Sequence, residues 1–567
     1  MPEADDERSL PRWLVFAGLG ALIVVPLVVA WTVLHDPHWI ALNDLAQIEM
    51  RVRDVATAHP PALGPPGRFE AYGEIGSHPG PMAFYVLWPA YMLLGADGWA
   101  LQGASLLLQA VAAGLVVWVA FRRGGTGLAV AATGALLLLI HGLGTDRMAT
   151  PWNPNLPVLW WMLTLLAVWS VLVGDLVLLP VAAVAVTFCM QAHVSYGLPG
   201  VGLILLTAGW LIAHRRSDSD TGTGRRVGRW ALASLGLMLA LWLPPLVQQF
   251  TQDPGNMTII VGNWRHASEE SGDRISVAAA TDVWLEHIDV ARLARADTTE
   301  YTAEEVLHTD HGLHLGQRWP ALLLLAAWIG AVTLAWRRRD STLLRFHLVV
   351  GVAQLLGLVA ITRILGPAWR YLVLGSWATT AVMLLATVWT VVTLAPAPRW
   401  DRRILAVGVA AAVGLGVLAT VDAAQTEMED ITLARAVDRL AVRTDDYLAD
   451  DPAGCADQCH YLVTYSDPVN IASPVFGLML ELNKRGIDAK TTRDKVSSVR
   501  DSRVMDREFA SAEISMVVTD KLIAKSKKLA GWTEIAYVDP PDGHPMATFL
   551  VEPEPEVKEA AARSRGG

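Results

Sequence analysis

The sequence predicts a polytopic α-helical membrane protein that carries a small α/β domain after its last membrane span. Of the 567 residues, 53% are hydrophobic, and they are concentrated in runs of about 17–25 residues, the length that a helix needs to cross roughly 30 Å of hydrocarbon. Basic residues gather in alternate short loops, and strand patterns occur only near the C-terminus. We identify eleven runs: 13–34, 99–121, 126–143, 156–173, 175–191, 195–214, 230–250, 320–336, 343–363, 370–395 and 404–423.

The first run is expected to remain as a span, because it is too long for a cleaved signal peptide and lacks a small-residue cleavage site. Lys and Arg favour cytoplasmic loops. With a cytoplasmic N-terminus, all five basic clusters fall on one side, and an odd number of spans places the C-terminal region outside the plasma membrane. The clusters are Arg8 and Arg12; Arg122 and Arg123; Arg215, Arg216, Arg225, Arg226 and Arg229; Arg337, Arg338, Arg339 and Arg345; and Arg399, Arg402 and Arg403.

The first large exterior loop covers 35–98 and is crowded with charge. At helical spacing, residues 43–58 place apolar side chains on one face and charged side chains on the other, which is typical of an amphipathic helix on the membrane interface. The apolar segment 80–96 is expected to form a shallow helix, because a further span would put Arg122 and Arg123 outside. The charged residues of this loop include Asp44, Glu49, Arg51, Arg53, Asp54, Arg68, Glu70, Glu74 and His78.

Two further exterior regions complete the predicted organisation. The loop 251–319 begins with a charged stretch and becomes helical in pattern over 277–295, which favours a helical hairpin over the outer face, with a flexible linker as the alternative. After the membrane domain 1–423, residues 424–553 show a helical lead and then strand and helix patterns, which indicate an α/β domain. Residues 554–567 have no core-forming pattern and are expected to be disordered.

Charge and cysteine usage restrict the partners and the redox chemistry. The net charge of −10 lies mostly in the outer loops and the tail, so it gives no indication of a nucleic-acid partner, and none is predicted. Cys189 lies in an apolar run and is interpreted as a small core residue. Cys455 and Cys459 lie in the exterior region, where an oxidising compartment favours a disulfide. A metal site with His460 is the alternative, but no second pair of ligands is nearby.

The sequence contains none of the short motifs that are typical of nucleotide-binding proteins, zinc proteases or serine hydrolases. There is no Walker loop, no G-x-G-x-x-G in a strand context, no H-E-x-x-H and no G-x-S-x-G. The predicted cytoplasmic loops are also too short to bind a nucleotide sugar.

Three motifs follow the first two spans. They are the acidic residue Asp44 shortly after the first span, the sequence HPGPMAFY from His78 to Tyr85, and the basic stop AFRRGG after the second span. Together they resemble the GT-C superfamily of membrane glycosyltransferases, which use polyprenyl-phosphate sugars, and in particular actinobacterial cell-wall arabinosyl- and mannosyl-type transferases. The resemblance covers the first five or six spans. Asn43 precedes Asp44 where many relatives have a second acidic residue, which argues against a strictly two-carboxylate or metal-bridged mechanism.

The resemblance implies that Asp44 is the general base. A hydroxyl that attacks an anomeric carbon must lose its proton, and a carboxylate can accept that proton. The alternative is that Asp44 caps the helix that follows, since Asp favours that position, although Asn43 alone could serve as the cap.

Arginine residues are expected to contact the donor phosphate, because guanidinium groups bind phosphate through several hydrogen bonds. Arg51, Arg53 and Arg68 lie in the first exterior loop, where snorkelling to lipid headgroups is the alternative. Arg370 stands at the outer entrance of the span 370–395, a position suited to a lipid-phosphate clamp, with anchoring of the span as the alternative.

Polar residues at the outer ends of spans are expected to bind the sugar through hydrogen bonds to its hydroxyls. His78 could contact the sugar phosphate or hold a divalent cation, the one cofactor considered, or it could be a polar turn residue. The aromatic residues nearby, Trp152 among them, are interpreted mainly as an interfacial belt. The predicted substrate-binding set is His78, Glu49, Asn153, His193 and Tyr85.

The function predicted is transfer of a sugar from a polyprenyl-phosphate donor to a hydroxyl of an exported cell-envelope glycan, glycolipid or protein. The alternatives are a lipid-linked sugar transporter or flippase and a non-catalytic envelope assembly protein. A transporter would need polar residues inside several spans, whereas here the polar residues gather at their outer ends.

Overall fold

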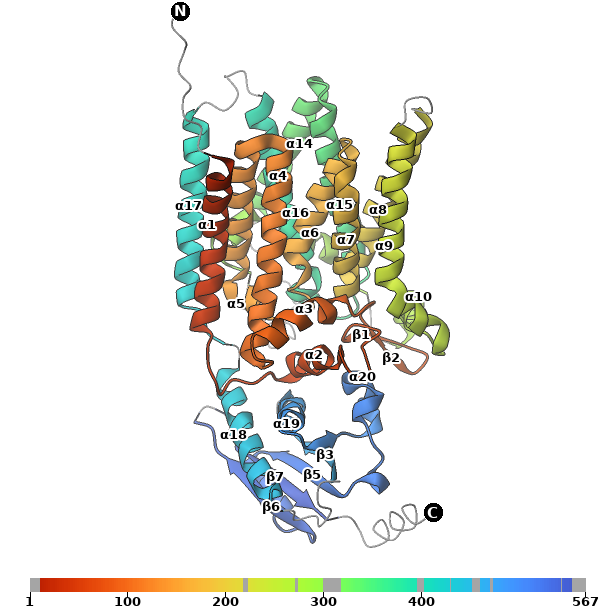
Figure 1. Ribbon diagram of the computed structural model, residues 1–567, viewed down its shortest axis with the longest axis vertical. Coiled ribbons are helices and arrows are strands. Elements are labelled where there is room, and N and C mark those ends of the chain that lie inside the picture. Colours follow the sequence, from red (N-terminus) through yellow and green to blue (C-terminus); the bar gives the residue numbers. More distant parts are fainter. Residues whose placement is uncertain are drawn as a thin grey trace, which may run out of the picture.

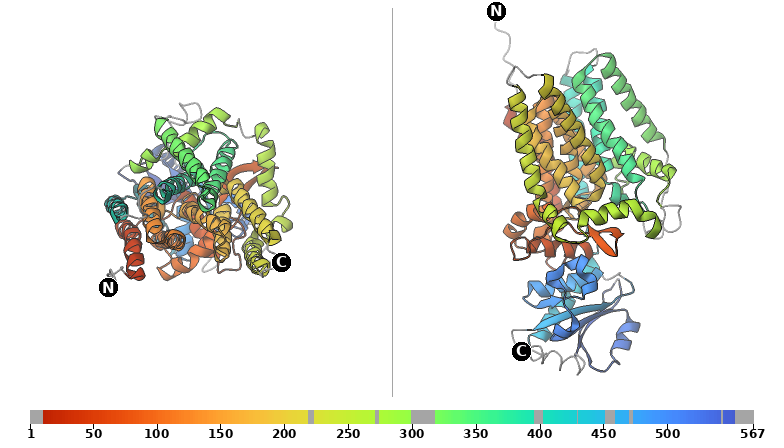
Figure 2. Two further views of the ribbon diagram at one scale, coloured as in Figure 1. Left: turned by 90° about the horizontal axis from the view of Figure 1, so that it is seen from above. Right: turned by 90° about the vertical axis from the view of Figure 1, so that its right-hand side faces the viewer.

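The structure, a computed structural model, describes residues 11–217, 223–270, 274–298, 318–394, 402–428, 430–450, 459–469, 473–541 and 543–552. Apolar helices form one bundle, and a smaller domain with a β-sheet is stacked on one end of it (Figures 1 and 2). Within the described residues, eight helices are long and apolar enough to cross a membrane. The predicted fold class, a polytopic helical membrane protein with a C-terminal α/β domain, is confirmed.

Every one of the eleven predicted runs lies on a helix of the bundle, and α4 contains two of them. Shorter apolar helices, α6 and α7, account for the runs beyond the eight long helices. The bundle helices are α1 (Arg12–Val33), α4 (Gly98–Leu143), α6 (Pro157–Leu172), α7 (Leu179–Ala192), α8 (Gly197–Ser217), α9 (Thr223–Thr251), α14 (Trp319–Arg337), α15 (Ser341–Ile361), α16 (Gly375–Leu394) and α17 (Arg402–Ala424).

Helix α4 reverses direction in its middle. Gly124 and Gly125 have non-helical backbone angles, and Gly125 adopts φ 64° and ψ −157°, a region that is essentially restricted to glycine. The Ser105 hydroxyl, near the start of α4, donates a hydrogen bond of 2.8 Å to the Met148 carbonyl, just beyond its end. The two arms therefore lie side by side and correspond to two predicted spans.

Gly125→Ala is expected to lower the free energy of unfolding by about 1–3 kcal/mol, because a side chain makes this backbone conformation unfavourable. No atom outside its own neighbourhood lies within 4 Å of the added Cβ, so the effect would come from the backbone and not from a collision. Thermal unfolding of the purified protein measures it. Gly134→Ala, in the regular part of the same helix, is the control and should be neutral or stabilising. Equal behaviour of the two variants would contradict the prediction.

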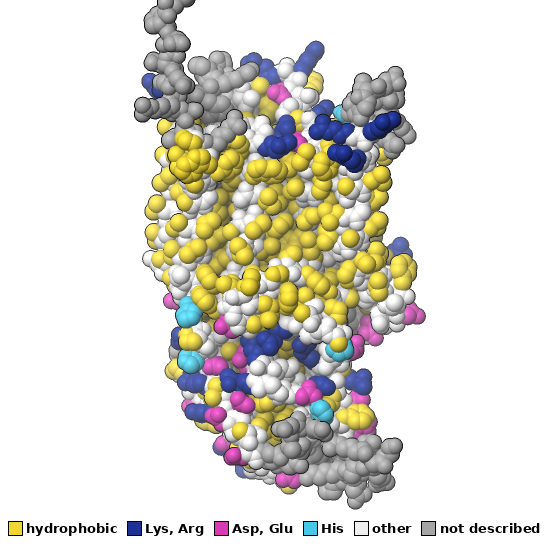
Figure 3. Space-filling model, in the orientation of Figure 1, with side chains coloured by type: hydrophobic (Ala, Val, Ile, Leu, Met, Phe, Trp, Pro, Cys, Tyr) yellow, Lys and Arg dark blue, Asp and Glu magenta, His cyan; other side chains and the backbone are white. Residues whose placement is uncertain are grey.

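The two ends of the bundle differ in charge. Lys and Arg side chains gather at the end away from the C-terminal domain (Figure 3), where α4 reverses and where α14 ends and α15 and α17 begin (Figure 1). Of the predicted basic clusters, Arg8 and Arg399 lie outside the described residues. The opposite end carries the exterior segments and the C-terminal domain.

Those segments include helices that were only partly predicted. As predicted, the apolar 80–96 segment forms a short helix, α3. The charged stretch that lacked periodicity is also helical and forms α10, which packs on the hairpin of β1 and β2 through Ile259 and through hydrogen bonds from Asn256 and Asn263 to carbonyls of the hairpin. The bounds are α2 (Asn43–Asp54), β1 (Pro66–Ala71), β2 (Glu74–Ser77), α3 (Met82–Leu93), α5 (Thr145–Ala149), α10 (Asn256–Glu270), α11 (Val277–Ile288) and α12 (Val290–Ala294). Residues 299–317 of the predicted loop 251–319 lie outside the described residues.

The C-terminal domain contains a five-stranded sheet in the order β4-β3-β5-β7-β6. Strand β3 pairs in parallel with β4 and β5, whereas β7 pairs antiparallel with β5 and β6. The strand and helix patterns predicted for this region fall on β3, α19, β5, β6 and β7, and the short β4 was missed. The bounds are α18 (Ile431–Leu448), β3 (His460–Ser466), α19 (Ser473–Lys484), β4 (Asp488–Lys490), α20 (Val496–Val499), β5 (Ala512–Val518), α21 (Asp520–Ser526), β6 (Trp532–Val538) and β7 (Met546–Val551). The predicted disordered tail 554–567 lies outside the described residues.

Helix α2 does not lie at an interface with its charged face in solvent, as its amphipathic pattern had suggested. It is covered on both sides: Ile48 and Val52 belong to the core of the bundle, whereas Ala46 and Met50 belong to the core of the C-terminal domain. Glu49 is 0% exposed. The charged face is buried because the C-terminal domain packs on it.

Candidate active site

Asp44 stands in the first turn of α2, at the end of the bundle that carries the C-terminal domain. The preceding residue, Asn43, has a left-handed backbone with φ 44°. The N-cap of the helix is Leu42, and no side chain caps it, so the interpretation of Asp44 or Asn43 as a helix cap is wrong. Instead, the Trp152 indole N–H donates a hydrogen bond of 3.0 Å to Asp44 Oδ2.

The environment of Asp44 favours its protonated form more than water does. Burial raises the pKa of its carboxyl group above the usual value of 3.8, although the hydrogen bond from Trp152 and the charge of Arg51 both lower it. Among the described residues, Asp44 takes part in no ion pair. A half-buried carboxylate with a raised pKa is a better proton acceptor than an exposed one.

A chain of contacts connects Asp44 to a second element of the site. The ring of Trp152 lies 4.9 Å from the ring of Tyr371, centroid to centroid. An N–H of Arg68 on β1 donates a hydrogen bond of 3.0 Å to the Tyr371 hydroxyl. The structure therefore brings the exposed guanidinium of Arg68 to the same side as Asp44, from a strand that follows it in the sequence.

Arg370 is buried in a cluster of three charges. Its Nε and Nη2 lie 2.9 Å and 2.7 Å from Glu286 Oε1, and Arg292 Nη1 lies 2.5 Å from the same oxygen. Arg370 directly precedes Tyr371, so the cluster adjoins the contacts described above. At the edge of this cluster, Arg292 Nε lies 4.0 Å from Asp297 Oδ2, an exposed carboxylate.

His78 and His193 form a stacked pair, with ring centroids 4.6 Å apart and planes at 28°. The Val194 N–H donates to His78 Nδ1 at 3.2 Å, which places the proton of the neutral ring on Nε2. Burial lowers the pKa of both rings, that of His193 to about 3. Both imidazoles are therefore neutral at physiological pH. The Asn153 amide donates to the Ala192 carbonyl at 3.3 Å and so lies beside this pair.

No metal centre is evident in the described part of the chain, where no three His, Cys, Asp or Glu side chains are grouped as metal ligands would be. His78 contacts His193 and the Val194 N–H, and His193 contacts Ser195, so the neighbours described for the two rings include no carboxylate. A divalent cation at His78 remains a prediction without a ligand set.

Four of the predicted site residues make contacts that hold the surrounding elements together. Arg51 donates to the carbonyls of Ser497 and Ser498 at 3.0 Å and 2.7 Å, and burial lowers its pKa to about 9. The remaining three residues also make contacts that the sequence did not predict. An N–H of Arg53 donates to the Tyr91 hydroxyl at 3.2 Å, Glu49 pairs with Lys484 at 2.6 Å, and the Tyr85 hydroxyl donates to the Pro61 carbonyl at 3.1 Å.

Residues that the sequence did not assign to the site are Tyr371, Glu286 and Arg292, and Trp152 was interpreted mainly as part of an aromatic belt. A signal for Glu286 was present, because it interrupts the apolar stretch VWLEHI of α11, and an acidic residue in such a stretch usually has a partner. Nothing local identified that partner as Arg370.

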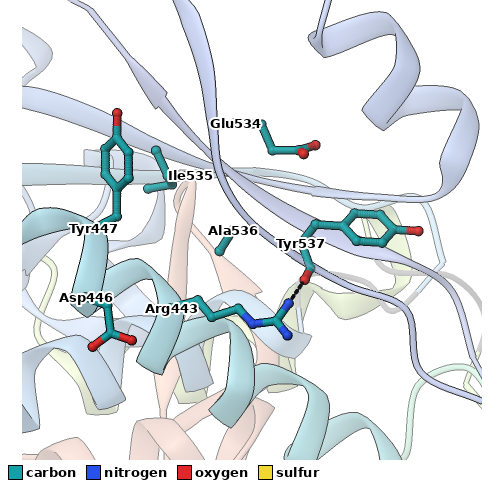
Figure 4. Close-up of a pocket in the computed structure, with 7 residues that line it drawn as sticks. All are labelled: Arg443, Asp446, Tyr447, Glu534, Ile535, Ala536 and Tyr537. Carbon is teal, nitrogen blue, oxygen red and sulfur yellow. Dashed lines mark hydrogen bonds between the residues drawn. The ribbon is translucent and has the colours of Figure 1, made fainter.

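A separate cavity of about 530 Å³ lies in the C-terminal domain between α18 and β6. Figure 4 shows the Arg443 guanidinium directed at the Tyr537 carbonyl, while the Tyr537 ring points away from the other residues. Figure 1 places β6 at the side of the domain remote from α2. The lining residues are Arg443, Asp446, Tyr447, Glu534, Ile535, Ala536 and Tyr537, and none of them contacts the predicted site.

The predicted disulfide joins Cys455 and Cys459. Cys459 is disulfide-bonded, but Cys455 lies outside the described residues, so the pairing stays a prediction. Cys189 is a free, buried cysteine, as expected for a small core residue.

Comparison with known proteins gives the fold but no close relative. No family model matches the chain, and no curated protein matches it. The structure is similar to ArnT from Cupriavidus metallidurans bound to undecaprenyl phosphate, with a TM-score of 0.54, 15% identity, and 94% of this chain and 98% of that chain covered. The apo state of ArnT gives a TM-score of 0.50 with 14% identity over the same shares of the two chains.

An oligosaccharyltransferase of Archaeoglobus fulgidus gives a lower TM-score of 0.47 with 13% identity, over 95% of this chain and 73% of that chain. The likeness to ArnT extends over nearly the whole of both chains. The chain therefore shares the fold of ArnT, and the fold implied by the sequence motifs is confirmed.

Proposed function

We propose that this protein is a membrane glycosyltransferase that moves a sugar from a polyprenyl-phosphate donor to a hydroxyl group, with Asp44 as the base. The observation that carries the proposal is the placement of Asp44. It is half-buried, caps no helix, and accepts a hydrogen bond from Trp152, whose ring packs on the Tyr371 that Arg68 contacts. The support from comparison is that ArnT, which shares this fold, binds undecaprenyl phosphate.

In the proposed reaction, the acceptor oxygen forms a bond to the anomeric carbon while the bond between that carbon and the phosphate oxygen breaks. The acceptor proton passes to Asp44, and the polyprenyl phosphate leaves with the bonding electron pair. Because the leaving group is anionic, cationic groups near it stabilise the transition state. Arg68, and Arg370 beside the Tyr371 that Arg68 contacts, are the groups proposed for this role.

The neutral pair of His78 and His193 is proposed to bind the sugar. In the tautomer set by Val194, His78 presents Nε2–H as a donor, and neutral donors suit hydroxyl groups without attracting a second phosphate. Asn153, beside the pair, is assigned to the same role.

For the acceptor, we propose a hydroxyl on an exported cell-envelope glycan, glycolipid or protein, as in the actinobacterial cell-wall transferases that the motifs resemble. The gathering of Lys and Arg at the opposite end of the bundle supports a cytoplasmic N-terminus and a site on the outer side of the plasma membrane.

The transferase proposal is tested with purified protein in liposomes, short-chain polyprenyl-phosphate sugars as donors, and a cell-envelope glycan preparation as acceptor. Appearance of labelled sugar in the acceptor fraction is the expected result. Movement of the labelled donor across the bilayer without transfer would instead support a lipid-linked sugar transporter.

The rate of transfer is expected to fall at acid pH, because only the ionised Asp44 can accept a proton. Burial raises the pKa of Asp44 above 3.8, so the acid limb of kcat/KM should have an apparent pKa above that value. Trp152→Phe removes a hydrogen bond that lowers this pKa and should move the limb to higher pH. The measurement is a pH–rate profile of both proteins, and a limb that stays in place or moves to lower pH in Trp152→Phe would contradict the assignment.

A further inference from the structure

Helix α19 of the C-terminal domain runs along α2, the helix that carries Asp44. Gly477 of α19 lies against Ala41 and Leu42, and Lys484 lies against Glu49. On both helices the second contact follows two turns after the first, so the helices run in the same direction and in register. Figure 1 shows α19 directly beside α2, between it and the sheet.

The first contact fixes the start of α2. A Cβ on Gly477 would lie 2.7 Å from the end of the Leu42 side chain and 3.0 Å from the Ala41 carbonyl oxygen. A methyl group at position 477 would therefore force the Leu42 side chain to shift and would press on the Ala41 carbonyl. Leu42 is the N-cap of α2, and Asp44 follows two residues later.

The second contact is a buried ion pair. Lys484 Nζ lies 2.6 Å from Glu49 Oε1 and 2.8 Å from Glu481 Oε1, and the Tyr91 hydroxyl donates to the same Glu49 oxygen at 2.8 Å. The Glu49 side chain is fully buried and the Lys484 side chain is 15% exposed. Without the ammonium group, the buried carboxylate of Glu49 would lose its direct ion pair and keep the Tyr91 hydrogen bond and the more distant charge of Arg53, which is unfavourable.

We infer that α19 positions the catalytic carboxylate: Gly477 sets the place of the α2 N-terminus and Lys484 sets the rotation of α2 about its axis, so both are positioning residues for Asp44. The inference rests on the proposed function for its catalytic consequence, whereas the restraint of α2 is a property of the structure alone. The C-terminal domain is thus part of the catalytic unit, although none of its residues need touch the substrate.

The test uses the full-length protein and two interface variants, Lys484→Met and Gly477→Ala. Hydrogen–deuterium exchange of the α2 amides is expected to become at least about tenfold faster in both, because Lys484→Met removes a buried ion pair and Gly477→Ala pushes the start of α2 away from α19. With sugar transfer as the second readout, kcat should fall by up to about 100-fold, the usual effect of a base misplaced by about 1 Å, while KM for the donor stays within a factor of two of wild type, since Arg68 and the His78 pair are not on α2.

Lys527→Met is the matched control, because Lys527 forms an exposed ion pair with Glu534 in the same domain; it should change neither readout. Leu42→Ala combined with Gly477→Ala should restore slow exchange and most of kcat, since it removes the side chain that the new methyl group meets. If Lys484→Met does not fold, Lys484→Arg, which keeps the charge, replaces it, and the same two readouts are measured: exchange of the α2 amides and kcat for sugar transfer.

Unchanged exchange of α2 in both interface variants would overturn the inference, as would a loss of kcat that Lys527→Met shares. If the wild-type protein transfers no sugar from any donor, the proposed function fails, but faster exchange of α2 in the two variants would still establish its restraint by α19.

Discussion

Replacing Asp44 by Asn is expected to lower kcat for sugar transfer by about 10²–10⁴-fold, the usual contribution of a general base. Asn is nearly the same size and can keep the hydrogen bond from Trp152 through its carbonyl oxygen, so the loss would reflect the missing proton acceptor. Initial rates with saturating donor and acceptor measure the effect, and KM for the donor should change little.

Glu74→Gln is the matched control for this experiment, because Glu74 is an exposed carboxylate in the same exterior loop and should tolerate the change. Thermal unfolding of each variant shows whether the protein is folded. Full activity of a folded Asp44→Asn protein would move the role of base to another carboxylate. Glu74 would then be a stronger candidate than Glu49, because Glu49 is buried against Lys484.

Glu286→Gln is expected to lower the free energy of unfolding by about 3–5 kcal/mol, the usual effect of removing one partner from a buried ion pair. Arg370 and Arg292 both lie within 2.9 Å of the Glu286 carboxylate, and without it two buried guanidinium groups would repel each other. Denaturant or thermal unfolding in detergent measures the change. Sugar transfer should also fall, because Arg370 adjoins Tyr371 and the Arg68 contact.

Asp282→Asn, on the same helix, provides the comparison. Asp282 pairs with Arg318, whose side chain is 52% exposed, and such pairs contribute about 1 kcal/mol or less. A similar destabilisation by both variants would show that the charge on α11, and not the buried cluster, determines stability.

The sequence predicted those features that depend on local patterns. The lengths of the apolar runs located every bundle helix, and the basic stop AFRRGG separated the two runs that form the arms of α4. The position of Asp44 just after the first span identified the residue on which the proposed function depends. Each of these conclusions needs only the chain near the residue concerned.

The assignments that were incomplete depend on residues far apart in the chain. Arg51 was predicted to face the membrane or the donor phosphate, but it is covered by Ser497 and Ser498. The charged side of α2 could not be recognised as buried, because the surface that buries it is formed by α19. For the same reason, the hydrogen bond between Trp152 and Asp44 was not distinguished from an aromatic belt at the membrane surface.

The burial of α2 between two cores has a consequence for biosynthesis. Arg51 and Ser498 are 447 residues apart in the sequence, and at roughly 5–20 residues per second the ribosome needs tens of seconds to add the residues that separate them. During that time the membrane helices can insert, while the charged side of α2 remains exposed at the membrane surface because α19 has not yet been synthesised. A chain that ends before α19 would therefore contain every span but not the surface that packs on α2. Only a completely translated protein would have the complete site.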